Sequence, residues 1–160
     1  MAIVLNQNAF ADLLEDMGIT LFTEVSISGF MPAEISEDLP PQTLKLLRDY
    51  PEAVGGLYSP MCVKRDGVWH LMKHNIWVRD PDQWTRRAEA ISTMALIHEV
   101  VHCSQAESRG AEGFRDYNDQ CERRFGYKDN PLEVEAYKLS EWLWKTVWRD
   151  NPVRLLEEVF

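Results

Sequence analysis

The sequence predicts an α+β fold, in which a small antiparallel or mixed sheet is followed by a long helix and a C-terminal helix. Residues 57–78 are rich in β-branched and aromatic side chains, which favour strands. Helix-start signals then follow at Asp80 and again at Asn130. With 160 residues, the chain is expected to form one domain, residues 1–160, with one site.

The first predicted elements are a helix and a strand. Apolar residues recur at helical spacing from Asn8 to Met17, and Gly18 suits a left-handed helix end. The segment from Ile19 to Ile27 alternates in part and is rich in β-branched residues, so we expect a strand that ends near Gly29. Residues 42–48 then predict a short helix.

The main sheet is predicted from residues 57–78. The sequence Arg65-Asp66-Gly67 interrupts this segment with a turn signal that is typical of a hairpin. His70 and His74 share one face of the second strand but lie roughly 13 Å apart. Because that separation is too large for one ion, both are expected to be ordinary strand residues.

Two helices follow, each opened by a capping sequence. In Asp80-Pro81-Asp82-Gln83 the aspartate can cap, proline fits the first helical position and glutamine can complete a capping box. This helix is expected to run from about residue 81 to about residue 105. The sequence Asn130-Pro131-Leu132-Glu133 has the same logic and predicts a helix that reaches roughly Arg149.

Composition excludes some classes of partner. The formal net charge of -9 opposes attraction to phosphate backbones and anionic lipids, so neither nucleic acid nor a membrane is an expected partner. No segment approaches the length of a membrane span. Cys62, Cys103 and Cys121 are an odd number without a paired spacing, which suits a reducing compartment. We therefore expect a cytoplasmic protein.

The motif that carries chemistry is His98-Glu99-Val100-Val101-His102, which reads HExxH. Residues four apart lie on one face of a helix, so both imidazoles can reach one ion. Zinc (Zn2+) suits neutral imidazoles and leaves one position for water in catalytic sites. Glu99 points about 100° away around the helix. It is expected to be the catalytic general base, which takes a proton from that water during attack on a carbonyl.

The rest of the helix supports a buried site. On a helical wheel, Ile91, Met94, Ala95 and Val101 share the side of the two histidines, so this face is expected to be buried. Unpaired imidazoles would be costly there. Gln105 continues the same face and is expected to be a polar group behind a ligand or at the edge of the core.

Two histidines require a third ligand, and the sequence offers three candidates. Glu133 lies at the start of the downstream helix, but as the third helical residue after Asn130 it can also close a capping box. Glu135 falls on the apolar stripe of that helix and would be buried if the stripe packs. Cys62 would be the ligand in a peptide deformylase, a class of amidohydrolase that also uses HExxH.

The pattern from His98 to His102, followed by Glu133-Val134-Glu135-Ala136, resembles HExxH and E-x-x-A of the minigluzincin peptidases and the ImmA/IrrE family. The likeness extends from the hairpin to the second helix. It implies a minigluzincin-like fold, Glu133 as the third zinc ligand, and Ala136 as a small residue that lets two helices approach. It also implies a zinc-dependent metallopeptidase that acts on one or a few protein or peptide targets. Tyr137 stands where these families often have Asp or Asn.

A peptidase also needs an oxyanion donor and a way to hold an extended substrate. Tyr117, Tyr127 and Tyr137 can each donate a hydroxyl hydrogen bond to a developing oxyanion. We expect Tyr127 in this role, because it lies in the loop 126–130 that leads to the ligand helix. The segment Asn75–Val78 resembles the edge strand along which such peptidases add the substrate backbone.

A non-catalytic function is the main alternative. The same fold can belong to a regulatory or interaction protein in which zinc is structural. A structural zinc site is normally closed by four protein ligands. Contact of Cys103 or Cys121 with the ion would therefore favour this alternative.

Overall fold

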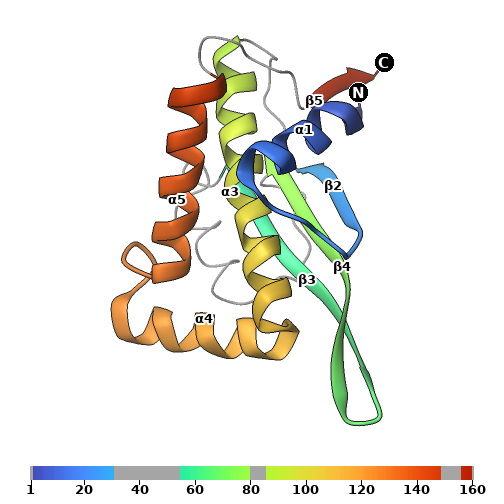
Figure 1. Cartoon of the computed structure of the whole chain (residues 1–160), viewed down its shortest axis with the longest axis vertical. Helices are drawn as coiled ribbons and strands as arrows, with labels where there is room; N and C mark the ends of the chain where they lie inside the picture. The colour runs from blue at the N-terminus through green and yellow to red at the C-terminus, as the bar shows by residue number, and fades with distance from the viewer. Residues whose placement is uncertain (1, 31–54, 80–85, 149–155, 160) are drawn as a thin grey trace.

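Figure 1 shows a small sheet packed against helices, with the longest helix, α3 (Arg86–Arg109), in the middle of the molecule. The computed structural model describes residues 2–30, 55–79, 86–148 and 156–159. The sheet is three-stranded and consists, in spatial order, of β2 (Val25–Phe30), β4 (Val68–Arg79) and β3 (Gly56–Arg65). One pair is parallel and the other antiparallel, so the predicted α+β class with a small mixed sheet is confirmed.

Helix α1 (Gln7–Met17) begins and ends at capping residues. The Asn6 side chain accepts a hydrogen bond from the Ala9 N–H at 3.1 Å, which satisfies a donor at the free end of the helix. Gly18 has a φ of 66°, in the left-handed region that favours glycine, and its N–H donates to the Glu15 carbonyl. The predicted helix is confirmed.

Strands β3 and β4 form the predicted hairpin, which extends beyond the helices in Figure 1. Asp66 and Gly67 have φ values of 53° and 79°. Two successive left-handed residues are typical of the tight turns whose twist matches that of the flanking strands.

Strand β4 lies in the centre of the sheet. Residues 75–78 pair with residues 26–29 of β2 on one side and with residues 56–59 of β3 on the other. The prediction that Asn75–Val78 forms an edge strand is therefore wrong. The cause is β2, which starts at Val25 rather than at Ile19 and pairs in parallel with a strand far along the chain. Among the described strands, β3 is the edge next to α3.

Helix α3 ends at Arg109, four residues beyond the predicted end at residue 105. The stop signal is Gly110, which has a φ of 76°. Helix α4 (Ala111–Phe125) follows directly and was not predicted. Its sequence is mostly polar, although Phe114, Tyr117, Cys121 and Phe125 recur at helical spacing and could have indicated it. In Figure 1, α4 crosses below the ends of α3 and α5.

Helix α5 (Pro131–Leu143) begins at the predicted cap. The Asn130 side chain accepts a hydrogen bond from the Leu132 N–H at 3.0 Å, and proline occupies the first turn. The helix continues as a π-helical segment, η2 (Trp144–Trp148), so the predicted helix is confirmed. It lies beside α3.

The two ends of the chain pair with each other. Strand β1 (Ala2–Leu5) is antiparallel to β5 (Leu156–Val159), and this small sheet was not predicted. The predicted helix at 42–48 and the cap at 80–83 lie outside the described residues. In the described part of the chain, no helix has both the length and the apolar character needed to cross a membrane.

The main hydrophobic core joins α1, the sheet, α3 and the end of α5. Its largest fully buried apolar side chains are Leu13, Ile76, Val78, Leu96, Ile97, Val100 and Leu143. Burying such side chains contributes about 1.5–3 kcal/mol each, which holds α3 firmly against the sheet. Ile91 is 52% exposed, so the face predicted to be buried does not extend to the start of the helix.

Candidate metal centre

Helix α3 brings the two histidines of the HExxH motif together. His98 and His102 are 7% and 6% exposed, and their ring centroids lie 4.9 Å apart. Ring packing also constrains them: Tyr137 lies against His98 with centroids 4.3 Å apart, and Tyr58 stacks on His102 at 6.2 Å. Buried imidazoles at this spacing need polar partners, because burial without them is costly.

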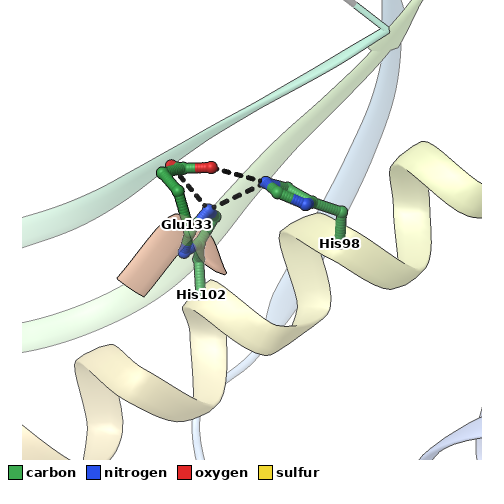
Figure 2. A group of neighbouring side chains, drawn as sticks. All are labelled: His98, His102 and Glu133. Atoms are coloured by element: carbon green, nitrogen blue, oxygen red, sulfur yellow. Dashed lines mark hydrogen bonds and ion pairs between the residues drawn. The ribbon is translucent and has the colours of Figure 1, made fainter. Parts of the chain in front are cut away.

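Glu133 of α5 supplies the partner for both rings. Its Oε2 lies 2.8 Å from the Nε2 of His98, and its Oε1 lies 3.1 Å from the Nε2 of His102. The two Nε2 atoms are 3.2 Å apart. Figure 2 shows the carboxylate facing both rings, and the three buried residues form a group that can bind a metal ion.

The donor set fits a first-row divalent ion. Four ligands around zinc at its usual bond lengths lie about 3.3 Å from one another. The observed separations of 2.8, 3.1 and 3.2 Å are only slightly shorter. Imidazole and carboxylate also suit other divalent ions of this series, so the donors alone do not select the metal.

The structure assigns Glu133 to the histidines rather than to a capping box, and it separates Glu133 from the rival ligand Glu135. The Asn130 N–H donates to the Tyr127 carbonyl rather than to the Glu133 carboxylate, so Glu133 does not close a capping box. Glu135 is exposed, which contradicts its predicted burial on the apolar stripe, and it accepts a hydrogen bond from Gln105 at 3.2 Å. Only Glu133 joins the histidines.

The buried Glu133, His98 and His102 influence one another's protonation. Burial alone would raise the pKa of the Glu133 carboxyl, but hydrogen bonds from His102 and His98 outweigh it and lower the pKa to about 2. Burial alone would lower the pKa of His102, but the hydrogen bond to Glu133 and the charge of Glu99 raise it to about 9. The Glu133 carboxylate and the His102 imidazole therefore each stabilise the charged form of the other.

Gln105 determines which nitrogen of His102 faces the group. The Gln105 amide donates to the Leu132 carbonyl at 3.0 Å and to Glu135, which leaves its oxygen as an acceptor. That oxygen lies 2.8 Å from the Nδ1 of His102, so Nδ1 carries the proton. The Nε2 of a neutral His102 then presents its lone pair to the metal position, as expected for a ligand supported from behind.

Glu99 is buried beside this group. It is 6% exposed, and among the described residues it has no hydrogen bond or ion pair. Burial raises the pKa of its carboxyl, the two histidines oppose the rise, and Glu133 adds to it. A Cβ at Gly56 would lie 3.1 Å from Glu99 Cγ, so β3 approaches this side chain closely.

A pocket of about 450 Å³ opens beside the three ligand candidates. Its walls come from β3, α3, α4 and α5, and Glu99 lines it together with the two histidines and Glu133. A ligand from outside the protein can therefore reach both the metal position and Glu99.

Two of the three candidate tyrosines line this pocket. They are Tyr127 and Tyr137. Tyr127 is 45% exposed as a whole residue, but partial burial of its hydroxyl, the nearby charge of Glu133 and a hydrogen bond with Tyr137 raise its pKa, so the hydroxyl remains protonated. Tyr117 instead packs against a hydrophobic cluster that includes Phe114, with Arg109 over its ring.

The cysteines do not join the metal group. Cys103 is buried in the main core, and Cys62 lines a second pocket with Trp69 and Arg115. Cys121 is buried elsewhere on α4. Among the described residues, no fourth His, Cys, Asp or Glu completes the group.

A buried hydrogen-bond chain behind the pocket was missed by the sequence analysis. His74 is fully buried, with the Tyr58 hydroxyl 2.8 Å from its Nδ1 and Glu107 Oε1 2.9 Å from its Nε2. His74 lies in β4 and outside the metal group, as expected for a strand residue, but its burial and hydrogen bonds were not predicted. Its partners come from β3 and α3, and no local pattern indicates such contacts.

The fold and the site together define an α+β protein with a buried His-His-Glu group that can bind a metal ion. Comparisons of this chain with models of protein families, with curated proteins and with solved structures found no match. The likeness to minigluzincins and to the ImmA/IrrE family therefore rests on the motif residues.

Proposed function

We propose that this protein is a zinc-dependent metallopeptidase of gluzincin type that hydrolyses peptide bonds in one or a few protein targets. The observation that carries the proposal is the buried group of His98, His102 and Glu133, which opens into a pocket beside the unpartnered carboxylate of Glu99. These are the parts that hydrolysis assisted by a metal requires.

Each residue has a role that follows from its place. When bound, the ion supplies Lewis acidity and lowers the pKa of a water molecule. Glu99 accepts a proton from that water and returns it to the leaving amine; burial raises the pKa of its carboxyl, which suits a base that must also act as an acid. Tyr127, whose hydroxyl stays protonated, donates to the oxyanion.

The described ligand set favours catalysis over a purely structural site. Structural zinc sites are normally closed by four protein ligands, whereas catalytic sites leave a position open. Here three described side chains converge, and neither Cys103 nor Cys121 belongs to the group. A pocket beside the metal position gives an outside ligand access.

The edge strand β3 offers a place for an extended substrate. Gly56, Leu57 and Tyr58 line the pocket, and β3 is one of the two edge strands of the described sheet. An extended peptide can add its backbone to such an edge. In this proposal β3 takes the part that the sequence analysis assigned to Asn75–Val78.

Metal analysis and cleavage assays test the proposal together. The wild type should hold one zinc ion per chain, Glu133→Gln should lose it, and the matched variant Glu135→Gln should keep it. Glu99→Gln should retain zinc but cleave no member of a quenched fluorescent peptide library that the wild type cleaves. Full zinc retention by Glu133→Gln would remove that ligand, and equal cleavage by Glu99→Gln would refute the mechanism. Zinc binding without any cleavage by the wild type would favour the non-catalytic alternative.

A further inference from the structure

Helix α4 contributes one wall of the pocket through residues spaced four apart. Phe114, Asn118 and Glu122 all line the pocket, as expected for side chains on one face of a helix. The Asn118 oxygen accepts a hydrogen bond from the Asn130 side chain at 2.8 Å. Since Asn130 also caps α5, this contact fixes the α4 wall relative to the helix that carries Glu133.

Glu122 has no compensating charge in this wall. Its side chain is half-buried, and among the described residues it forms no hydrogen bond or ion pair. Burial raises the pKa of its carboxyl, and the charges of Asp119 and Glu133 raise it further. Neither Lys nor Arg is among the described residues that line the pocket.

Three carboxylates line the pocket: Glu99, Glu122 and Glu133. Glu133 belongs to the group that can bind a metal ion, and Glu99 follows His98 directly on α3. Glu122 lies on α4 and outside that group, so its carboxylate can take a basic side chain of a ligand as its partner.

The other walls suit a long basic side chain. Tyr127 and Tyr137 line the same pocket, and aromatic rings accommodate both an alkyl stem and a guanidinium or ammonium group. Independently, the nine-tenths-buried Glu99 lines the pocket without a partner, which indicates that a polar ligand completes this space.

We propose that Glu122 determines substrate specificity by binding a Lys or Arg side chain of the peptide close to the scissile bond. This inference rests on the proposed peptidase function. The charge-assisted hydrogen bond is expected to favour such a peptide by about tenfold over its neutral analogue.

Matched peptides test this role. Library members that contain Lys or Arg are compared with copies in which norleucine or citrulline replaces the basic residue. The wild type should prefer the basic peptide by about tenfold in kcat/KM. Glu122→Gln should lose the preference while keeping its zinc and its melting temperature. Glu122→Lys should prefer Asp or Glu at the same position. Asp116→Asn removes one charge from an exposed position of the same helix and should keep the wild-type preference.

A binding experiment separates this inference from the proposed function. A library of randomised hexapeptides is incubated with the zinc-loaded Glu99→Gln variant and with the zinc-loaded double variant Glu99→Gln/Glu122→Gln, and the bound peptides are sequenced by mass spectrometry. Lys and Arg should be enriched only when Glu122 is present. If the wild type cleaves nothing, the peptidase proposal fails but this enrichment still tests the basic pocket. Cleavage or binding without a basic preference, or the same preference in Glu122→Gln, would overturn the inference alone.

Discussion

The close approach of Gly56 to Glu99 predicts a variant that separates positioning of the general base from metal binding. In Gly56→Ala the new Cβ would lie 3.1 Å from Glu99 Cγ and 3.4 Å from Ala95 Cβ. Carbon atoms are comfortable at about 3.5–4.0 Å, so Glu99 must move by roughly half an ångström. Ala95 is fixed by its helix, whereas Glu99 can shift into the open pocket.

The expected magnitudes follow from this geometry. A catalytic group misplaced by about 1 Å costs roughly 100-fold in rate, so half that shift should lower kcat about tenfold or more. Crowding lowers the free energy of unfolding by about 1 kcal/mol. The smaller conformational freedom of alanine in the unfolded chain raises it by about 0.4–1 kcal/mol. The free energy of unfolding should therefore stay nearly unchanged. The three atoms nearest to the new Cβ belong to Glu99 and Ala95 rather than to a histidine, so zinc content should also be unchanged.

Gly55→Ala is the matched control. Its Cβ would lie 3.3 Å from Ala95 Cβ and contacts no atom of Glu99. Crowding against Ala95 and the smaller conformational freedom of the unfolded chain nearly cancel here as well, so this variant should also keep its free energy of unfolding within about 1 kcal/mol, and it should keep kcat per folded molecule. The assays are cleavage of a library-derived peptide, zinc content and urea unfolding. Full kcat in Gly56→Ala would refute the claim that β3 holds Glu99 in place.

Three further predictions concern the stability of the fold and the cap of α5. Burial alone would raise the pKa of the Glu107 carboxyl, but hydrogen bonds from His74 and from two backbone N–H groups lower it below the ordinary 4.5. The ionised Glu107 carboxylate therefore stabilises the fold fully above pH 4.5, and this contribution is lost as the pH falls through the lowered pKa of the folded state. In urea unfolding, Glu107→Gln should be less stable than the wild type by about 1 kcal/mol at pH 7 and by a smaller amount at pH 3. Gly18→Ala forces alanine into a left-handed conformation and should lower stability by about 1 kcal/mol in thermal melts. Asn130→Ala removes the cap of α5, so it should lower the free energy of unfolding by about 2 kcal/mol and weaken zinc binding, as measured by competition with a chelator. Asn118→Ala removes only the hydrogen bond between α4 and Asn130, so it should weaken zinc binding less.

Elements with local signals could be predicted from the sequence. The ends of α1, the turn at Asp66-Gly67 and the start of α5 each depend on side chains or φ angles of a few adjacent residues. Pairings between distant segments could not be predicted. The parallel contact of β2 with β4 and the pairing of the chain ends depend on residues far apart in sequence. The error about Asn75–Val78 follows from the first of these.

Residues of the site also differ in whether a local sequence pattern could predict their contacts. Spacing alone predicts that His98 and His102 share a face, since both lie on one helix. The contact of Gln105 with His102 is also local to that helix, and the structure confirms that Gln105 lies behind a ligand candidate. By contrast, the partners of His74 come from two other elements, so its burial and its hydrogen bonds had no signal in the sequence.

The capping of α5 determines whether Glu133 or Glu135 faces the two histidines. Because Asn130 satisfies the Leu132 N–H and its own N–H donates to Tyr127, the first turn of α5 does not need the Glu133 carboxylate. Glu133 is thereby free to face α3, while Glu135, two positions on, points to solvent and contacts Gln105. Since the helix start fixes the rotation of α5, moving the cap by one residue would turn every following side chain by about 100° and remove the carboxylate from the histidines. The cap at Asn130 is therefore part of the metal centre as much as of the helix.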